Sequence, residues 1–270
     1  VGTAPDIIVV GGMTIACCLS PREEPSIDDR YCILYEDEQI AVINKSGNLP
    51  CHPAGRYYEH TLVRLLLVRN HFTEAHLVNR IDRETSGLVL VAKTAAAASC
   101  CGRALMGGHF RKSYWVLVEG VWPSTDLSRT VRGVIRLERG GVVRKKYVFR
   151  ETDEPTRGEG EQFAETQFRF LSGDGVLSLL EAEPITGRPH QIRATLRSIG
   201  YPVVGDKLYG VDESIYARMG EDAITDRDWS ILRMKRQALH ARCLAFRHPV
   251  TREDLSFEAP LPDDEPLWRI

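Results

Sequence analysis

The chain has 270 residues, of which 43% are hydrophobic and 27% are charged, and its formal net charge is −2 at pH 7. This composition is typical of a globular protein and excludes a disordered or fibrous chain. No apolar run approaches the roughly 18 residues that a membrane span needs, so we expect no membrane association. The length is compatible with one or two domains. The overall charge does not indicate nucleic-acid binding, so the local distribution of charge has to be considered.

The seven cysteines include the adjacent pairs Cys17-Cys18 and Cys100-Cys101 and no C-x-x-C spacing. Adjacent cysteines are poorly placed both for disulfide bonds and for a zinc site. The pattern therefore predicts reduced thiols, a cytoplasmic location and no metal centre.

Residues 1–30 are interpreted as an N-terminal extension or linker. Within them, Ile7–Gly12 is similar to the first strand of a dinucleotide-binding fold, but a G-x-G-x-x-G turn does not follow. A strand or tail packed on the main domain is the favoured interpretation. The acidic Asp6, rather than a basic cluster, precedes this apolar run, so we expect no signal peptide. Pro21–Asp29 has the composition of a linker.

From Tyr31 onward the pattern predicts both strands and helices. Ile33–Tyr35 and Ile40–Lys45 flank an acidic turn, which predicts two short strands. Apolar residues at helical spacing predict an amphipathic helix within Glu59–Asn70. The short apolar run Leu88–Ala92, which follows a glycine, predicts a buried strand.

The polar segment Asn79–Ser86 leads into this buried strand and places Asp82 between Arg80 and Arg83. Loops that are held by a rigid scaffold commonly carry catalytic groups, so Asp82 is a candidate catalytic carboxylate. A solvated turn closed by Arg–Asp pairs is the alternative.

The middle of the chain contains a further predicted helix and further predicted strands. A helix is expected from Thr94 to Gly107-Gly108, and a strand with Tyr114 on one face is expected over Ser113–Val121. Ser128–Arg150 holds eight basic residues and one acid, a local charge of +7, with a predicted hairpin tip at Gly140-Gly141. Such a hairpin is either a phosphate-contacting surface or a solvated ribbon. The acidic segment 151–165 predicts an exposed loop.

A third helix is predicted over Pro189–Ile199, because Ile192, Leu196 and Ile199 form an apolar stripe that ends at a glycine. Arg193 lies beside this stripe, where an arginine either extends its head group to solvent or has a catalytic role. The remaining predictions are a partly helical insertion (211–235), a strand (237–249), a last hairpin (251–262) and a tail (263–270).

Four blocks in this order resemble the motifs of the RluA-type pseudouridine synthases. Arg80–Leu88 resembles R-L-D-x-x-T-S-G-L, and Lys112–Gly120 resembles K-x-Y-x-A-x-V-x-G. Gly187–Leu196 resembles G-R-x-H-Q-I-R-x-x-L, with G-D-x-x-Y-G following at residues 205–210. Leu239–Pro249 resembles L-H-A-x-x-L-x-F-x-H-P. The resemblance covers about residues 31–262, and it implies that these residues are the catalytic domain.

The resemblance implies an α+β fold, with a mixed, mainly antiparallel sheet, flanking helices and a central cleft. It also implies an RNA pseudouridine synthase that flips specific uridines out of ribosomal or transfer RNA. The reaction is an isomerisation, so no cofactor is expected. The expected partner is the RNA substrate, with no obligatory protein partner, and the expected state is a monomer.

The resemblance implies site residues as well. Asp82 is the expected catalytic carboxylate, either as a nucleophile or as a base, Arg193 is its expected partner, and Tyr114 is expected to stack on the target uracil. Further substrate-binding residues are expected at Arg80, which would fill the place of the flipped nucleotide or hold its phosphate, and at Arg83, Arg188, His190 and Ile192.

Three positions depart from the family pattern. Ser46 stands where proline is usual, Asn79 where many relatives have histidine, and Ile81 where leucine is usual. We expect the exchanges at Asn79 and Ile81 to leave the chemistry intact. The alternative functions are a non-catalytic RNA-binding module, a glycosidase-like enzyme, which would need a second carboxylate, and a nucleotide-cofactor oxidoreductase.

Overall fold

The structure is a computed structural model that describes residues 10, 12–13, 23–123, 125, 127–140, 143, 146–154, 158–262 and 266–270. Most of the apolar segment Ile7–Gly12 lies outside the described residues. So do Arg144 and Lys145 of the predicted basic hairpin and residues 263–265 of the predicted tail. The sequence interpretations of these segments stay predictions.

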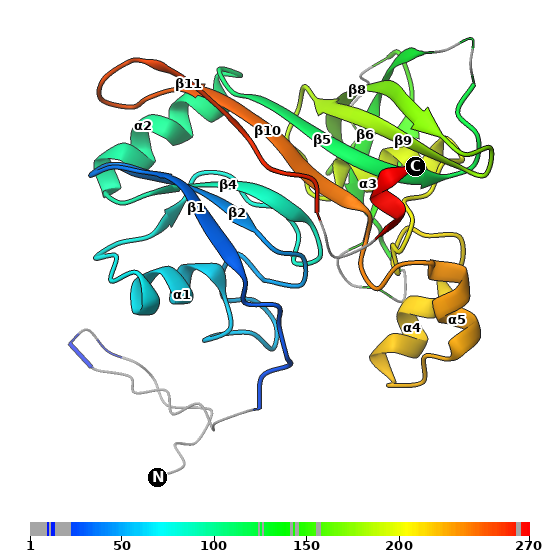
Figure 1. The fold of residues 1–270 in the computed structure, drawn as a ribbon, viewed down its shortest axis with the longest axis horizontal. Helices are drawn as coiled ribbons and strands as arrows, with labels where there is room; N and C mark the ends of the chain where they lie inside the picture. The colour runs from blue at the N-terminus through cyan, green and yellow to red at the C-terminus, as the bar shows by residue number, and fades with distance from the viewer. Residues whose placement is uncertain are drawn as a thin grey trace.

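The described strands form an 11-stranded mixed sheet, which organises the whole chain (Figure 1). Its order is β1-β2-β4-β10-β5-β9-β8-β6-β7, with β3 paired to β4 and β11 paired to β10. The pairing of β4 with β10 is parallel, and the other pairings are antiparallel. The predicted α+β class with a mixed, mainly antiparallel sheet is confirmed.

The N-terminal half of the sheet is covered by a helix on each face. Its elements are β1 (Tyr31–Glu36), β2 (Ile40–Lys45), α1 (Leu62–Arg69), β3 (His76–Leu77), β4 (Ser86–Ala92) and α2 (Ala95–Met106). Alternate residues of β2 face opposite sides: Ile40 packs in the core under α2 and Ala41 in the core over α1. Figure 1 shows α1 and α2 on opposite sides of these strands. This double cover explains why Ile40–Ile43 of β2 and Leu88–Ala92 of β4 are continuously apolar.

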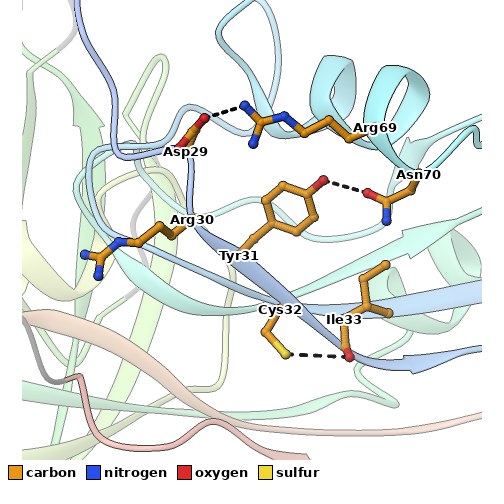
Figure 2. A pocket seen from close by; sticks show the side chains of 7 residues that line it. All are labelled: Asp29, Arg30, Tyr31, Cys32, Ile33, Arg69 and Asn70. Atoms are coloured by element: carbon orange, nitrogen blue, oxygen red, sulfur yellow. Dashed lines mark hydrogen bonds and ion pairs between the residues drawn. The ribbon is translucent and has the colours of Figure 1, made fainter.

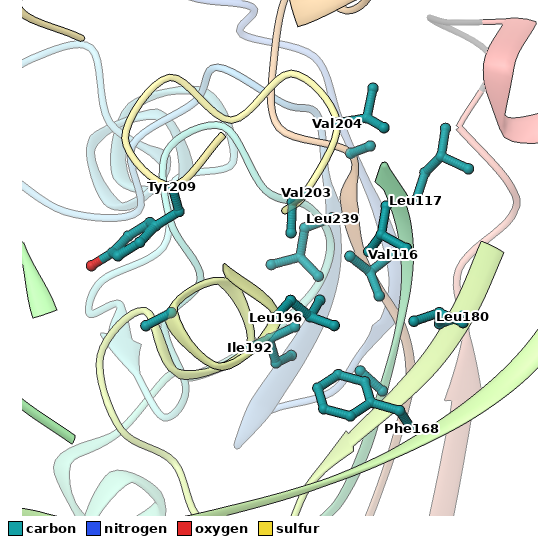
Figure 3. Packing of buried hydrophobic residues seen from close by; sticks show 14 of the residues in the cluster. Val116, Leu117, Phe168, Leu180, Ile192, Leu196, Val203, Val204, Tyr209 and Leu239 are labelled. Atoms are coloured by element: carbon teal, nitrogen blue, oxygen red, sulfur yellow. The ribbon is translucent and has the colours of Figure 1, made fainter. Parts of the chain in front are cut away.

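The C-terminal half contains the larger hydrophobic core. Its elements are β5 (Arg111–Glu119), β6 (Ser128–Leu137), β7 (Tyr147–Glu151), β8 (Gln162–Gly173), β9 (Leu177–Pro184), α3 (Gln191–Ser198), α4 (Ser214–Gly220), α5 (Asp226–Leu232), β10 (Leu239–Arg247) and β11 (Asp254–Glu258). Ile192 and Leu196 of α3 pack against Val116 of β5 and Phe168 of β8 (Figure 3). This packing turns the side of α3 that carries Ile192 and Leu196 toward the sheet, and it thereby determines which side of the helix is turned away from the sheet.

The two halves join where β4 lies beside β10. The paired residues are Ser86 with His240 and Gly87 with Ala241. Gly87 has φ +106°, and a Cβ atom built there would lie 2.2 Å from the carbonyl oxygen of Ala241. A glycine is therefore required at this junction, at the end of the loop that carries Asp82.

Helix boundaries depart slightly from the predictions for identifiable reasons. α1 begins at Leu62 rather than Glu59, because Thr61 caps the helix by accepting a hydrogen bond from the backbone of Arg64. α3 begins at Gln191, because His190 has a left-handed backbone with φ 54°. The partly helical character of 211–235 is confirmed by α4 and α5.

The C-terminal residues pack onto the larger core. Pro266–Arg269 form a 3-10 turn, and Trp268 is 1% exposed among the core side chains of the C-terminal half. The hydroxyl group of Ser172 donates a hydrogen bond to the carbonyl oxygen of Ile270 at 2.9 Å. No helix in the described part of the chain is long and apolar enough to cross a bilayer.

Candidate active site

The loop between β3 and β4 carries Asp82 and is fastened at both ends. Asn79 is 7% exposed, and its Oδ1 accepts a hydrogen bond from the backbone of Leu90 at 2.7 Å. The carbonyl oxygen of Arg83 accepts hydrogen bonds from Leu49 N at 3.1 Å and from Lys45 Nζ at 3.1 Å. Asn79 therefore has a structural role in this chain, and the loop is held in one conformation.

Asp82 lies against a buried guanidinium group. Arg193 Nη1 donates to Asp82 Oδ2 at 2.6 Å, although the two residues are 111 positions apart in the sequence. The same guanidinium donates to Asp206 through Nε at 2.6 Å and through Nη2 at 2.9 Å. Asp206 in turn accepts backbone hydrogen bonds from Leu208 and Tyr209, both at 2.9 Å. Arg193 thus bridges two carboxylates, and Asp206 orients it toward Asp82.

The charges of this cluster keep both aspartates ionised. Burial by itself raises the pKa of Asp82, but the nearby Arg193 charge, helped by His190 and by hydrogen bonds, holds that pKa below its ordinary value. Burial also raises the pKa of Asp206, but the charge and hydrogen bonds of Arg193 prevail and lower it. The two carboxylates outweigh the effect of burial on Arg193 and raise its pKa. The side chain of Asp82 is 32% exposed, whereas that of Arg193 is 8% exposed, so the carboxylate is the accessible member of the pair.

His190 lies on the other side of the Asp82 carboxylate. Its Nε2 is 3.9 Å from Asp82 Oδ1, and its Nδ1 is 3.0 Å from the hydroxyl oxygen of Tyr209. That oxygen also accepts a hydrogen bond from the backbone of Tyr147 at 2.8 Å. Burial lowers the pKa of His190, although Asp82 opposes this effect, so a neutral imidazole faces the carboxylate at pH 7.

Tyr114 lies in β5, beside β10, with Ala241 as its paired residue. Burial, with a contribution from the charge of Asp82, raises the pKa of the Tyr114 hydroxyl group, so it stays protonated at neutral pH. The described contacts do not connect Tyr114 with Asp82, so its place in the site stays a prediction. Ile192, by contrast, is 6% exposed within the hydrophobic core, and its role as an apolar wall of the site stays a prediction.

The three other predicted arginines have separate surroundings. Arg80 is exposed, with His52 Nε2 at 3.3 Å from its Nη1. Arg83 donates to the hydroxyl group of Tyr57 at 2.5 Å and to Glu84 at 3.0 Å. The exposed Arg188 donates from Nε to a backbone carbonyl group at 3.1 Å. The structure thus brings Asp82, Arg193 and His190 into direct proximity, and it shows no contact of these three arginines with Asp82 among the described residues.

Sequence reasoning missed two groups that contact this cluster. Asp206 had been noted only as part of a motif, and its position after a glycine gives no sign that it is completely buried. Gln237 Nε2 lies 3.4 Å from Asp82 Oδ2 and donates to Thr85 Oγ1 at 2.6 Å. Gln237 stands 155 positions from Asp82, so no local pattern could connect the two.

The basic hairpin is confirmed as a pair of strands, but its charge is offset. β6 and β7 pair from Gly133 with Glu151 to Leu137 with Tyr147. The ion pairs are Arg129–Glu151, Arg132–Glu165, Arg139–Glu159, Lys146–Glu213 and Arg150–Glu161. Most of the acids come from the segment 151–165, which the sequence interpretation treated as a separate exposed loop. The solvated ribbon is therefore the better supported of the two interpretations.

A shallow hollow of about 530 Å³ lies elsewhere, between β1 and the end of α1 (Figure 2). Two pairs of its polar groups bond each other: Arg69 pairs with Asp29, and the hydroxyl group of Tyr31 donates to Asn70 at 2.6 Å. It contains none of the eight predicted site residues. The candidate site is therefore the cluster around Asp82, and this hollow has no part in it.

Residues 39–198, which include the loop of Asp82 and the arginine of α3, match the family model described as RNA pseudouridylate synthase. The chain belongs to the RNA pseudouridine synthase family. The predicted resemblance to the RluA-type enzymes is confirmed.

Named relatives of this family align with most of the chain. A mitochondrial tRNA pseudouridine(32) synthase of Saccharomyces cerevisiae is 33% identical over 214 residues, which are 79% of this chain and 44% of the yeast protein. Ribosomal large subunit pseudouridine synthase D of Zymomonas mobilis is 31% identical over 87% of this chain and 70% of its own length. The Vibrio vulnificus protein of the same name is 31% identical over 97% and 78%.

Two solved human structures share the fold. Human RNA Pseudouridylate Synthase Domain Containing 1 has a TM-score of 0.65 and 24% identity, and it covers 88% of this chain and 86% of its own. Human RNA Pseudouridylate Synthase Domain Containing 4 has a TM-score of 0.64 and 26% identity, with 86% and 88% covered. These matches confirm the predicted pseudouridine synthase fold.

Proposed function

We propose that this chain converts specific uridines of structured RNA, ribosomal or transfer, into pseudouridine. The observation that carries the proposal is an accessible, ionised aspartate that is held by a buried arginine within the motifs of this family. The yeast relative is named as a tRNA pseudouridine synthase and the bacterial relatives as ribosomal large subunit pseudouridine synthases. These names support RNA as the substrate.

The reaction breaks the bond between uracil N1 and ribose C1′ and forms a bond between uracil C5 and C1′. The C5 proton leaves, and N1 takes up a proton, so substrate and product are isomers. Because no electrons are gained or lost, we propose that the enzyme uses no redox cofactor and no energy source.

Asp82 is the proposed catalytic carboxylate. Its Oδ2 accepts from Arg193 at 2.6 Å and faces Gln237 at 3.4 Å, which leaves Oδ1 for the ribose. Two roles fit an ionised carboxylate in this position: attack on C1′, or removal of a ribose proton. Arg193 keeps the carboxylate charged in either role, because protonation of Asp82 would cost the ion pair.

The target base has to leave the RNA stack to reach Asp82. We propose that Tyr114 stacks on the extruded uracil and that His190 and Ile192 line the remaining walls of the pocket. The exposed Arg80 would fill the place of the extruded nucleotide or hold its phosphate. Arg83 and Arg188 would contact the RNA backbone beside the target nucleotide. They would use the N–H groups that are not engaged in hydrogen bonds within the protein.

We propose residues 31–262 as the catalytic domain, acting as a monomer in the cytoplasm without an obligatory protein partner. The cysteines that the structure describes as free thiols support a reducing compartment.

The test is pseudouridine formation on total RNA, mapped by sequencing, with the wild type, Asp82→Asn and a control, Asp153→Asn on an exposed turn. We expect modification at defined uridines with the wild type and the control, and none with Asp82→Asn. Equal modification by Asp82→Asn would remove Asp82 from its role. RNA binding without modification by the wild type would favour the non-catalytic binding module.

A further inference from the structure

A second ion pair, between Glu84 and Lys207, holds the loop that carries Asp82. Glu84 Oε2 accepts from Lys207 Nζ at 2.7 Å and lies 3.3 Å from the backbone nitrogen of Gln237. Its other oxygen, Oε1, accepts from Arg83 at 3.0 Å. The side chains of Glu84 and Lys207 are 14% and 5% exposed, so little water reaches the pair.

Lys207 belongs to the segment that also orients the catalytic arginine. Its neighbour Asp206 holds Arg193 through two hydrogen bonds. Lys207 Nζ donates in addition to the carbonyl oxygen of Lys235, in the segment that leads into β10. Gly205 has φ +73°, and a Cβ atom there would lie 2.1 Å from the carbonyl oxygen of Arg236. Residues 205–207 are thus pressed against 235–237, and this packing leaves them little freedom to shift.

Both ion pairs connect the loop of Asp82 with residues 206–207, the pair of Glu84 directly and the pair of Asp82 through Arg193. Asp82 and Glu84 are two residues apart on the loop: Glu84 pairs with Lys207 itself, whereas Asp82 pairs with Arg193, which the adjacent Asp206 holds. Gln237 completes the connection, because its side chain donates to Thr85 at 2.6 Å and faces Asp82. We propose that Glu84 and Lys207 are positioning residues that set the placement of Asp82 relative to Arg193. This inference rests on the proposed function.

The alternative is that the pair only stabilises the fold. Removing one partner of a buried ion pair leaves an uncompensated charge, whereas removing both leaves none. A double substitution should therefore recover stability that each single substitution loses. If the pair positions Asp82, the double variant recovers stability but still lacks the ion pair that joins the loop of Asp82 to residues 205–207. Its catalytic activity then stays low.

The experiment compares Glu84→Gln, Lys207→Met and the double variant with the wild type. The substrate is an RNA fragment that carries the uridine identified by sequencing. We expect the melting temperature to fall in both single variants and to recover in the double variant. We expect kcat to fall by about 100-fold in all three, since a displacement near 1 Å can have that effect, while KM changes little.

A matched control breaks the ion pair of a buried carboxylate that does not touch the catalytic loop. Asp228 is 3% exposed and pairs with Arg218 at 2.5 Å, between α4 and α5. Asp228→Asn should lower the melting temperature and leave kcat unchanged. The conservative variant Glu84→Asp keeps the charge and should retain more activity than Glu84→Gln.

Recovery of kcat together with the melting temperature in the double variant would overturn the inference. So would a kcat of Asp228→Asn that falls as far as that of Glu84→Gln. A wild type that modifies no RNA would refute the proposed function itself. An active wild type with unaffected Glu84 and Lys207 variants would refute this inference alone.

Discussion

Replacement of Asp206 by asparagine tests whether this residue holds Arg193, the proposed partner of Asp82. The side chain of Asp206 is completely buried, accepts two hydrogen bonds from Arg193, and accepts two more from backbone N–H groups. Asparagine has nearly the same shape and can still accept from the backbone, but it carries no charge. Arg193 would then keep the Asp82 carboxylate as its ionised partner in the described site.

Breaking a buried ion pair by removing one partner costs about 3–5 kcal/mol of the free energy of unfolding. Because Asp82 remains 2.6 Å from the guanidinium, we expect the lower end of this range, about 3 kcal/mol. In a chain of this size each kcal/mol lowers the melting temperature by roughly 2–4 °C, so a decrease of about 6–12 °C is expected.

Urea denaturation and thermal melting measure this loss, and Asp82→Asn is the matched control. Asp82 is 32% exposed, and its removal leaves the pair of Arg193 with Asp206 intact. Asp82→Asn should therefore unfold within about 1 kcal/mol of the wild type and yet be inactive. Asp206→Asn with wild-type stability, or an equal loss in both variants, would refute this assignment of the structural and the catalytic carboxylate.

Three further predictions concern pH, the junction of the halves and the pocket. The folded pKa of Asp206 lies below its ordinary value of 3.8, so its contribution is present above pH 3.8 and is lost as the pH falls through the folded pKa. The difference in unfolding free energy between wild type and Asp206→Asn should therefore be constant above about pH 5 and shrink in more acidic urea titrations. Gly87→Ala should unfold at clearly lower urea, because its Cβ atom would collide with Ala241, whereas Gly102→Ala in open space on α2 should be neutral or stabilising by up to about 1 kcal/mol. A stable Gly87→Ala protein would contradict the close approach of β4 and β10. Tyr114→Leu should lower kcat/KM by about 5- to 150-fold, which corresponds to the loss of about 1–3 kcal/mol of stacking, and Tyr216→Leu on α4 should have no effect. Full activity of Tyr114→Leu would exclude stacking by Tyr114.

Periodicity alone was sufficient for much of the secondary structure. The apolar run of β4 and the alanine-rich helix α2 were predicted nearly to their ends, because Gly107 ends the helix and because hydrophobic burial follows the repeat of each element. α3 began later than predicted, because a left-handed residue, His190, precedes it. The contacts of its imidazole with Tyr209 and Tyr147 are likewise made to residues that are distant in the sequence.

The order of the four motifs identified the family, and with it Asp82, Tyr114 and Arg193 as candidates. These motifs are local strings, so the amino-acid sequence by itself can carry them. It could not show that Asp206 is the buried second carboxylate of Arg193, or that Gln237 and Lys207 reach the loop of Asp82. It also could not show that Arg129, Arg132 and Arg150 of the basic hairpin pair with acids from the following segment.

The physical reason is the same in each case. Local sequence determines where a strand or helix forms, because that depends on neighbours within a few residues. The electrostatic state of a side chain depends on burial and on charges within a few ångströms, whatever their separation along the chain. Here residues 82, 193, 206 and 237 meet because the sheet joins its two halves at β4 and β10. Only the tertiary structure decided which carboxylate faces solvent and which one holds the arginine.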